Sequence, residues 1–205
     1  MNENDKKISE TGLLLAENYG EKRIHVWEII LINLSENSEI AKWYCSQIPF
    51  GRFFSKQELE VMLQNYYPDL KDRTLKNPLN SLLNTFKESP LGEEIGAGEP
   101  MNVSRKPGVL RRSHDEISLV ATAYSLFKYA EKNNRYRMTI SEFYNDDQTE
   151  GIYRQFGLSR DVFEQNLRTL EQEQNHVLRA ELNMGLDNII LREDLTSLDI
   201  LKLLL

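Results

Sequence analysis

Cysteine is almost absent from this chain of 205 residues, because Cys45 is the only one. A single cysteine excludes an internal disulfide and a zinc site made of several cysteines, and a buried, reduced thiol is its ordinary state. Histidine is scarce too. The three histidines lie far apart, and none has the H-x-x-x-H or H-E-x-x-H spacing that binds zinc on one helix face. We therefore expect no metal, no cofactor and no enzymatic activity.

Long apolar runs are missing as well. The most apolar stretch, VWEIILINL, is too short to span a bilayer and contains Glu28. The N-terminal stretch MNENDKKISE is polar and lacks the apolar core of a secretory signal. Hydrophobic residues make up 40% of the chain and charged residues 28%, as is typical of soluble globular proteins. These features predict a cytoplasmic protein without a membrane partner.

Positive charge is in short supply, since the formal net charge is -7. An acidic chain is poorly suited to holding a phosphate backbone regardless of sequence. The charge is unevenly distributed, however. The segment Lys71–Arg112 contains eight Lys or Arg and five Asp or Glu, a net charge of +3, which leaves -10 for the rest. A local basic surface therefore remains compatible with the acidic total.

Apolar residues at helical spacing dominate the first hundred residues. They predict helices over residues 8–20, 23–37, 38–47, 54–67 and 78–86. In the second of these, the stripe Ile24, Trp27, Ile30, Leu31 and Leu34 is expected to face the core. Ser55 and Glu58 have the spacing of a capping box. Thr74 or Asn77 is expected to cap the fifth helix, because Pro78 is tolerated only in a first turn.

A proline- and glycine-rich segment, residues 89–112, follows these helices. It predicts a loop and then a hairpin, with MNV and VLRR as strands and RKPG as the turn. Several helices followed by a hairpin is the order of a winged helix-turn-helix.

The second half of the chain repeats this pattern without evident residue identity. Ser113 and Glu116 predict a capping box before a long helix over 114–134, and RYRM predicts a short strand. Thr139 and Ser159 are expected to cap two further helices. A hairpin turning at Gly185 and a C-terminal helix that folds back should follow. We therefore expect a mainly α protein with small β-hairpins, built as two tandem winged helix-turn-helix-like halves, residues 1–112 and 113–205.

Five stretches together resemble a known bacterial family. They are ETGLLLAEN, VWEIILINL, FSKQELEVML, TLKNPLNSLLNTFKESPLGEEIGAGE and LDNIILREDLTSLDILKLL. The chain resembles the C-terminal region of the bacterial domain-of-unknown-function family 4007, whose members often begin with a further N-terminal segment. Their genes commonly lie beside those for enzymes similar to phosphoadenosine-phosphosulfate (PAPS) reductase, in DNA phosphorothioation and phage-defence loci. The resemblance implies a role near DNA modification and supplies no catalytic residue.

Candidate DNA contacts lie on the expected fifth helix and on the hairpin that follows it. Basic residues there would neutralise phosphates, and asparagines on the polar side of the helix would reach base edges. The predicted contacts are Arg73, Lys76, Asn77, Asn80, Asn84, Arg105, Lys106, Arg111 and Arg112.

The second half mixes charges of both signs on its corresponding helix, which favours a protein partner. The resemblance implies that this partner is a PAPS-reductase-like enzyme. Two alternatives stay open. One is a protein-interaction scaffold whose basic residues are merely solvated. The other is an ordinary transcription regulator, which would bind spaced half-sites as a dimer. The sequence does not determine the oligomeric state.

Overall fold

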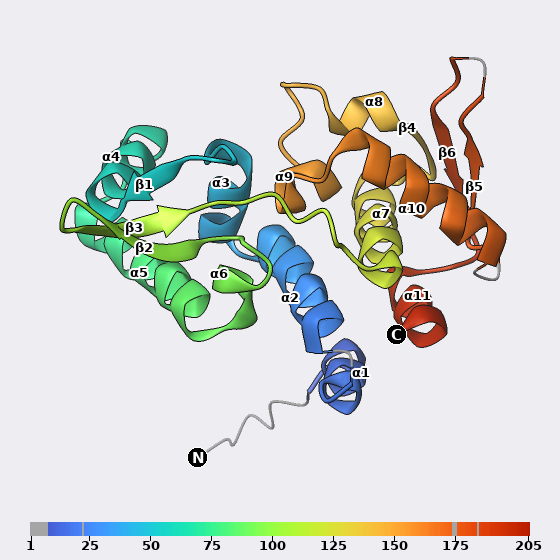
Figure 1. The fold of residues 1–205 in the computed structure, drawn as a ribbon, viewed down its shortest axis with the longest axis horizontal. Coiled ribbons are helices and arrows are strands. Elements are labelled where there is room, and N and C mark those ends of the chain that lie inside the picture. The colour runs from blue at the N-terminus through green and yellow to red at the C-terminus, as the bar shows by residue number, and fades with distance from the viewer. Residues whose placement is uncertain (1–7, 22, 174–175, 184) are drawn as a thin grey trace.

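The computed structural model describes residues 8–21, 23–173, 176–183 and 185–205, and it is mainly helical with two small antiparallel sheets (Figure 1). We keep the predicted division at residue 113, which stays a prediction, to name two halves. The first half contains α1 (Glu10–Asn18), α2 (Arg23–Asn37), α3 (Glu39–Gln47), β1 (Phe53–Ser55), α4 (Lys56–Tyr66), α5 (Asp72–Glu88), α6 (Pro90–Glu93), β2 (Glu99–Val103) and β3 (Lys106–Leu110). The second half contains α7 (Leu119–Asn133), β4 (Arg137–Thr139), α8 (Ile140–Phe143), α9 (Ile152–Phe156), α10 (Arg160–Glu173), β5 (Leu178–Glu181), β6 (Asn188–Leu191) and α11 (Ser197–Leu204).

The two sheets share one topology. Each consists of a short strand followed, after intervening helices, by a hairpin, and the strand orders are β1-β3-β2 and β4-β6-β5. Both hairpins and the strand β4 are confirmed, whereas β1 was not expected. Its pairing with β3 requires glycine at position 108, because a Cβ there would lie 2.2 Å from the carbonyl oxygen of Phe54. Gly108 is thus a strand residue whose missing side chain allows β1 to approach β3 closely. The turn expected at RKPG is therefore wrong.

Helix starts follow the side chains that satisfy their free N–H groups. The capping box of α4 is confirmed, since Ser55 and Glu58 bond to each other's backbone N–H. The box expected at Ser113 and Glu116 is wrong. α7 begins at Leu119, five residues later than expected, and Ser118 is its N-cap.

The buried carboxylate of Glu28 explains where α7 begins. Glu28 lies on α2 and is completely shielded from solvent. Its Oε1 accepts the N–H of Ser118 at 3.2 Å and lies 2.9 Å from His114 Nε2. A buried carboxylate needs such partners. The start of α7 is therefore fixed against α2 rather than at the first sequence position that could cap a helix.

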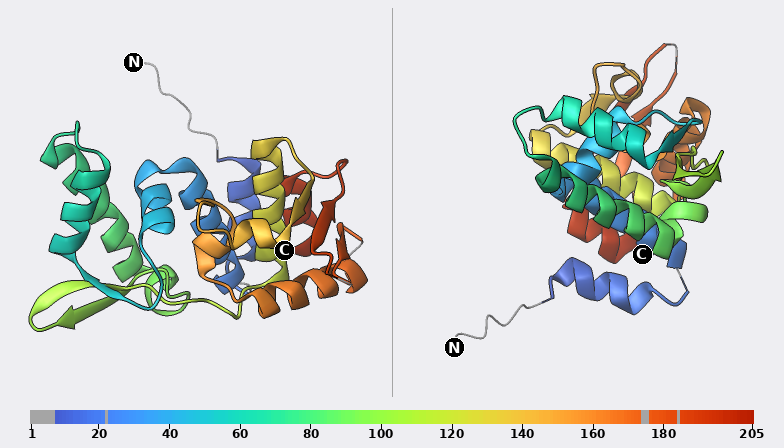
Figure 2. Two further views of the ribbon diagram at one scale, coloured as in Figure 1. Left: turned by 90° about the horizontal axis from the view of Figure 1, so that it is seen from above. Right: turned by 90° about the vertical axis from the view of Figure 1, so that its left-hand side faces the viewer.

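α2 occupies the centre of the molecule, between the first sheet and α7 (Figure 1). Figure 2 shows the same arrangement from above, with α2 and α3 between α4–α5 and α7. Because neighbours cover α2 on several sides, its buried residues are not the single stripe that the sequence predicts. They are Val26, Glu28, Ile29, Leu31, Ile32 and Ser35.

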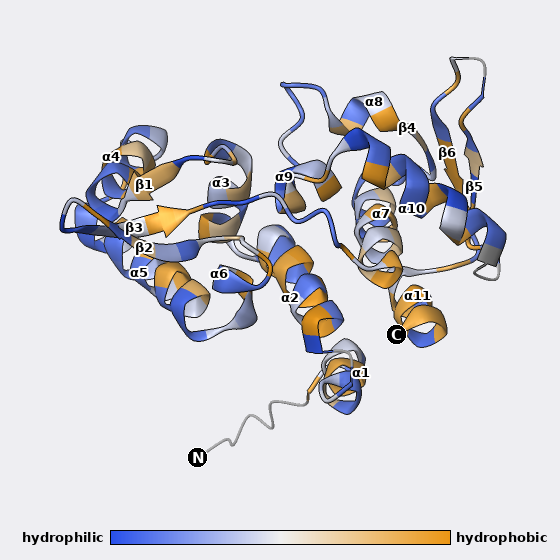
Figure 3. Ribbon diagram, viewed as in Figure 1, coloured by the Kyte–Doolittle hydropathy of each residue, from blue (hydrophilic) through white to orange (hydrophobic). Residues whose placement is uncertain are grey.

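α5 is longer than expected, since it begins at Asp72 and continues through Pro78. Its N-cap is Lys71, which makes no side-chain capping bond, so the expected caps at Thr74 and Asn77 are wrong. Proline removes one helical hydrogen bond. Burial of leucines on both sides of it, Leu75 and Leu79, offsets that cost. Figure 3 shows the resulting mixture of apolar and polar residues along this helix.

The C-terminal helix α11 folds back onto α7, as predicted. Ile200 and Leu201 are buried there, and α1 also packs on α11. An ion pair of 2.6 Å joins Lys202 Nζ of α11 to Glu10 Oε1 of α1. The N-terminal helix therefore contacts an element of the second half.

Candidate nucleic-acid interface

The helix α5 has one buried and one exposed face. Its buried residues are Leu75, Leu79, Leu82 and Phe86. The opposite side carries polar residues at intervals of three or four, which places them along one stripe of the helix. This stripe consists of Arg73, Asn77, Asn80, Asn84 and Lys87. Four of these residues were predicted as contacts, and the structure brings them together.

The side chains of the three asparagines of this stripe make no hydrogen bond with any residue in the described part of the chain. Four asparagines on other helices behave differently, because their side-chain amides donate to the carbonyl oxygen four residues earlier, although Asn65 of α4 also has no side-chain hydrogen bond with the described residues. This bond is made by Asn18, Asn33, Asn37 and Asn133. Asparagine is a poor helix former unless it bonds locally or caps. The α5 asparagines thus have no structural use that the folded chain reveals.

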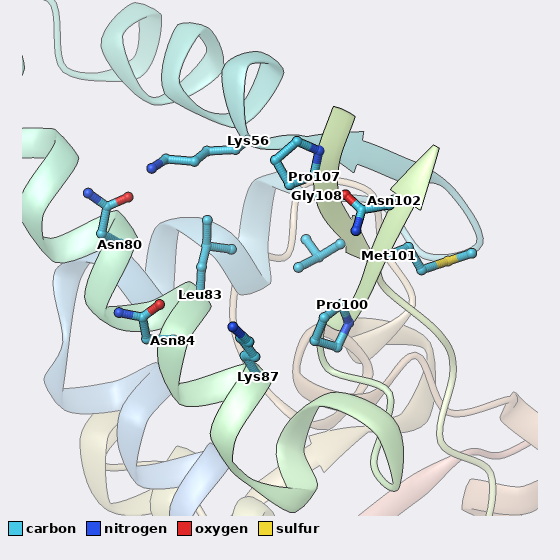
Figure 4. A pocket seen from close by; sticks show the side chains of 11 residues that line it. Lys56, Asn80, Leu83, Asn84, Lys87, Pro100, Met101, Asn102, Pro107 and Gly108 are labelled. Carbon is cyan, nitrogen blue, oxygen red and sulfur yellow. The ribbon is translucent and has the colours of Figure 1, made fainter. Parts of the chain in front are cut away.

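A groove of about 300 Å³ separates α5 from the β2–β3 hairpin (Figure 4). Asn80 and Asn84 face it from the helix, and Asn102 faces it from β2. Lys56 and Lys87 add positive charge. Leu83 and Val109 contribute apolar surface, and no carboxylate is among the described residues that line the groove. The groove therefore offers N–H donors and cations to a ligand that carries negative charge.

The β2–β3 hairpin turns earlier than the sequence predicts. Val103 pairs with Lys106, so only Ser104 and Arg105 form the loop. Arg105 is exposed at the tip and has no hydrogen bond or ion pair with the described residues. Lys106 is exposed as well and lies beside Arg52 and Glu58, on the α4 side of the hairpin.

Arg111 is not a surface residue, which corrects its prediction as a phosphate contact. Only 1% of it is exposed. Because β3 ends at Leu110, Arg111 follows the strand and turns inward. Its guanidinium donates to carbonyl oxygens at the C-terminal ends of two helices, including those of Cys45 in α3, of Ile48 just after it and of Arg154 in α9. Those carbonyls are the free acceptors of helix ends, so Arg111 joins the two halves.

Two other predicted cations are exposed but paired. Lys76 Nζ lies 3.1 Å from Asp72 Oδ2, and the hydrogen bond with this carboxylate raises the pKa of Lys76. Arg112 Nε lies 2.7 Å from Glu99 Oε2. Exposed ion pairs of this kind contribute little, about 0–1 kcal/mol. A phosphate can therefore replace the carboxylate partner at small cost.

Three residues of the groove with polar or charged side chains were missing from the predicted contacts: Lys56, Lys87 and Asn102. Lys87 was counted in the basic segment, but the predicted helix ended at Phe86, so Lys87 was not placed beside Asn84, where helical spacing puts it. Lys56 follows the cap of α4, and only the folded chain brings it to α5. Strand alternation turns Asn102 to the same side as Pro100, and a correct hairpin register would have revealed this.

The corresponding surface of the second half is acidic. Residues 113–205 contain ten Lys or Arg and sixteen Asp or Glu, a net charge of -6. On α10, Arg160 pairs with Glu164 at 3.0 Å and with Asp187 at 3.4 Å. Arg168 donates to the carbonyl oxygen of Leu182. This surface therefore offers a phosphate backbone little attraction.

Side-chain groups suited to metal binding or nucleophilic catalysis are sparse within the described ranges. No group of three or more His, Cys, Asp or Glu there could hold a metal ion. Burial raises the pKa of Cys45, which disfavours the reactive thiolate. His114 Nε2 lies within hydrogen-bond distance of the buried carboxylate of Glu28. The described helices also include no candidate for a membrane span.

The chain matches no protein-family model, no curated protein and no solved structure. Its function is therefore inferred from the geometry and chemistry of the α5 face.

Proposed function

We propose that each half is a winged helix. The order of elements supports this in both halves, because a helix, a strand, further helices and a hairpin follow one another. The strand order, with the last strand in the middle, supports it as well. In the first half α4 and α5 form the helix-turn-helix pair, and the β2–β3 hairpin is the wing. α5 is then the helix that such folds present to the major groove.

We infer that the first half binds duplex DNA. The observation that carries this inference is the stripe of unbonded asparagines on α5, beside a groove that no described carboxylate lines. Asparagine side chains pair with the N6 and N7 atoms of adenine in the major groove. Arg73, Lys87 and Lys106 neutralise phosphates directly. Lys76 and Arg112 do so by releasing their carboxylate partners.

At the level of the cell, we propose a non-enzymatic, cytoplasmic accessory protein of a bacterial DNA-modification or phage-defence system. The resemblance to the domain-of-unknown-function family 4007 supports this role by association. The net charge of -6 in the second half suits a protein partner better than DNA. A PAPS-reductase-like enzyme is the partner that the resemblance suggests.

The alternative is a protein-interaction scaffold without DNA contact. The pairing of Lys76 and Arg112 with carboxylates favours it, because these cations already have partners. The overall charge of -7 favours it as well. In that case the α5 stripe would be a solvated face or would contact protein.

Fluorescence anisotropy with labelled duplex DNA across a salt series distinguishes the two functions. We expect affinity to fall roughly a hundredfold between about 50 and 200 mM salt, as several phosphate contacts require. The double variant Arg73→Glu/Lys87→Glu should lose binding. The matched control, Arg137→Glu/Arg179→Glu, makes the same change of charge on the second half and should retain it. Absence of binding by the wild type at micromolar concentration in low salt would favour the scaffold.

A further inference from the structure

A pocket of about 520 Å³ lies between α1 and α2 of the first half and α7 and α11 of the second. Each of these four helices packs on two of the others (Figure 1). Small-molecule sites have volumes of this order and often lie between domains. Leu15, Ile30 and Leu34 give the pocket an apolar wall. Its size, place and lining are therefore those of a site for a small molecule.

Lys128 of α7 lines this pocket and has neither an ion pair nor a hydrogen bond with the described residues. It is half-buried, as are Lys42 and Lys56, but each of those has a glutamate within 4.0 Å. On α7 itself, Lys132 lies one turn later and reaches two carboxylates. An ammonium group that loses water without gaining an acceptor costs free energy. Lys128 is thus the only half-buried lysine in the described part of the chain whose charge the fold leaves uncompensated.

The one acidic residue at helical spacing from Lys128 already has other partners. Glu131 lies three residues later on α7, at a spacing that allows an ion pair. Its carboxylate instead accepts the N–H and the hydroxyl of Ser197, which begins α11. No carboxylate is among the described residues that line the pocket, although the chain has a net charge of -7. The charge of Lys128 is therefore available to an anion from outside the chain.

Hydroxyl groups line the same pocket. Ser9 and Ser38 are the N-caps of α1 and α3, and the Oγ of each accepts a backbone N–H. Their hydroxyl hydrogens remain available to donate, as does that of Thr11, whose side chain has no bond with the described residues. The pocket therefore combines one ammonium group, several hydroxyl donors and an apolar wall. This combination suits a small molecule that has one negative group and an apolar body.

We propose that this pocket binds a small amphipathic carboxylate, whose negative group contacts Lys128 and whose body lies against the apolar wall. One ammonium group suits one negative charge, whereas a phosphate monoester carries nearly two at neutral pH. Because the ligand contacts helices of both halves, it binds the folded chain and stabilises it. None of the described residues that line the pocket belongs to α5, so this inference is independent of the proposed DNA binding.

Octanoate and phenylpropionate are suitable probes, because each joins one carboxylate to an apolar body. Octanol has such a body without the charge, and inorganic phosphate has charge without the body. Titration calorimetry measures the affinity of the full chain for each, and thermal denaturation measures the stabilisation that follows. Lys128→Met removes the charge and keeps an unbranched side chain. The matched control, Lys71→Met, makes the same change at an exposed lysine that also has no partner among the described residues.

At least one carboxylate should bind the wild type and raise its melting temperature, and octanol and phosphate should bind about tenfold more weakly or worse. Lys128→Met should weaken carboxylate binding about tenfold or more, because a charge-assisted hydrogen bond is lost, and Lys71→Met should bind as the wild type does. Without ligand, Lys128→Met should melt no lower than the wild type, since the fold leaves this charge uncompensated.

Three results of the titrations would overturn the inference. They are failure of both carboxylates to bind at about 10 mM, carboxylate binding that Lys128→Met leaves unchanged, and equally tight binding of octanol or phosphate. A clearly lower melting temperature of ligand-free Lys128→Met would overturn it as well, because the fold itself would then use the charge.

Discussion

Arg111 stacks on Phe50, with its guanidinium carbon 3.9 Å from the centre of the ring. The same ring touches the second half, because a Cβ at Gly157 would lie 2.7 Å from it. Gly157 has φ of 64° and ends α9. A residue that the sequence predicts to be a phosphate contact is therefore a central contact between the two halves.

Loss of the Arg111 side chain should destabilise the protein strongly. Arg111→Met leaves several buried carbonyl oxygens without donors and should lower the free energy of unfolding by about 3–5 kcal/mol. The adjacent Arg112→Met removes an exposed ion pair and an exposed hydrogen bond to the carbonyl oxygen of Glu93, and should cost less than about 1 kcal/mol. Urea denaturation of both variants measures the difference. Equal, small losses would contradict the structural role of Arg111.

The turn between β2 and β3 should gain stability from glycine, because Arg105 has φ of 65°, which is unfavourable for a residue with a Cβ. Arg105→Gly removes the Cβ that disfavours positive φ and should raise the free energy of unfolding by about 1 kcal/mol. Lys106→Gly, one residue later in the extended strand, should lower it by about 0.5–1 kcal/mol. Thermal denaturation of the two variants provides the comparison. A loss of stability in Arg105→Gly would show that the turn is not strained.

Glu150 should make stability depend on pH. Its Oε1 lies 2.8 Å from both Lys42 Nζ and Lys132 Nζ. Burial alone would raise the pKa of Glu150, but the hydrogen bonds from the two lysines outweigh it and bring the pKa below its ordinary value of 4.5. The unfolded chain therefore takes up this proton first, so the carboxylate stabilises the fold above about pH 4.5 and ceases to do so as the pH falls through its folded pKa.

Glu150→Gln tests this dependence. It should lower the free energy of unfolding at about pH 6 and have much less effect at about pH 3, as urea denaturation at both pH values would show. Asp147→Asn removes an exposed carboxylate and should have a small effect at either pH. A destabilisation by Glu150→Gln that is the same at both pH values would contradict the ion-pair explanation.

Cys45 should react only when the protein opens. Burial raises the pKa of its thiol, and nearby Arg111 opposes this effect only in part. Because the thiolate is the reactive form, iodoacetamide should label the native protein far more slowly than the urea-unfolded chain. Mass spectrometry over time measures both rates. Native labelling as fast as that of the unfolded chain would show that the first-half core is open.

Local signals predicted most of the secondary structure. The capping box of Ser55 and Glu58, the second hairpin turn at Gly185 and the final helix are all confirmed. The predictions were wrong where contacts between residues far apart in the sequence determine where an element begins. Ser118 begins α7 because Glu28, ninety residues earlier, binds it, and no local pattern contains that information.

In the candidate site, too, local sequence signals predicted some features correctly and failed for others. Helical spacing alone placed Asn77, Asn80 and Asn84 on one exposed face. The predicted position of the first hairpin's turn was wrong because Pro107-Gly108 is a common turn signal. Here Pro107 pairs only with β2, since β1 reaches no further than Gly108, and so its missing N–H costs β3 no bond to β1. Arg111, which was expected on the surface of the hairpin, follows the end of β3 and lies in the core.

Side-chain amide resonances of a ¹⁵N-labelled protein, followed while a duplex of about 15 base pairs is added, test DNA binding by α5 most directly. The account predicts that the amides of Asn77, Asn80 and Asn84 shift, because they are unbonded in the free protein. Those of Asn33 and Asn133, which donate to helix carbonyls, should stay in place as internal controls. Unchanged α5 amides at saturating duplex, or shifts confined to residues 113–205, would contradict it.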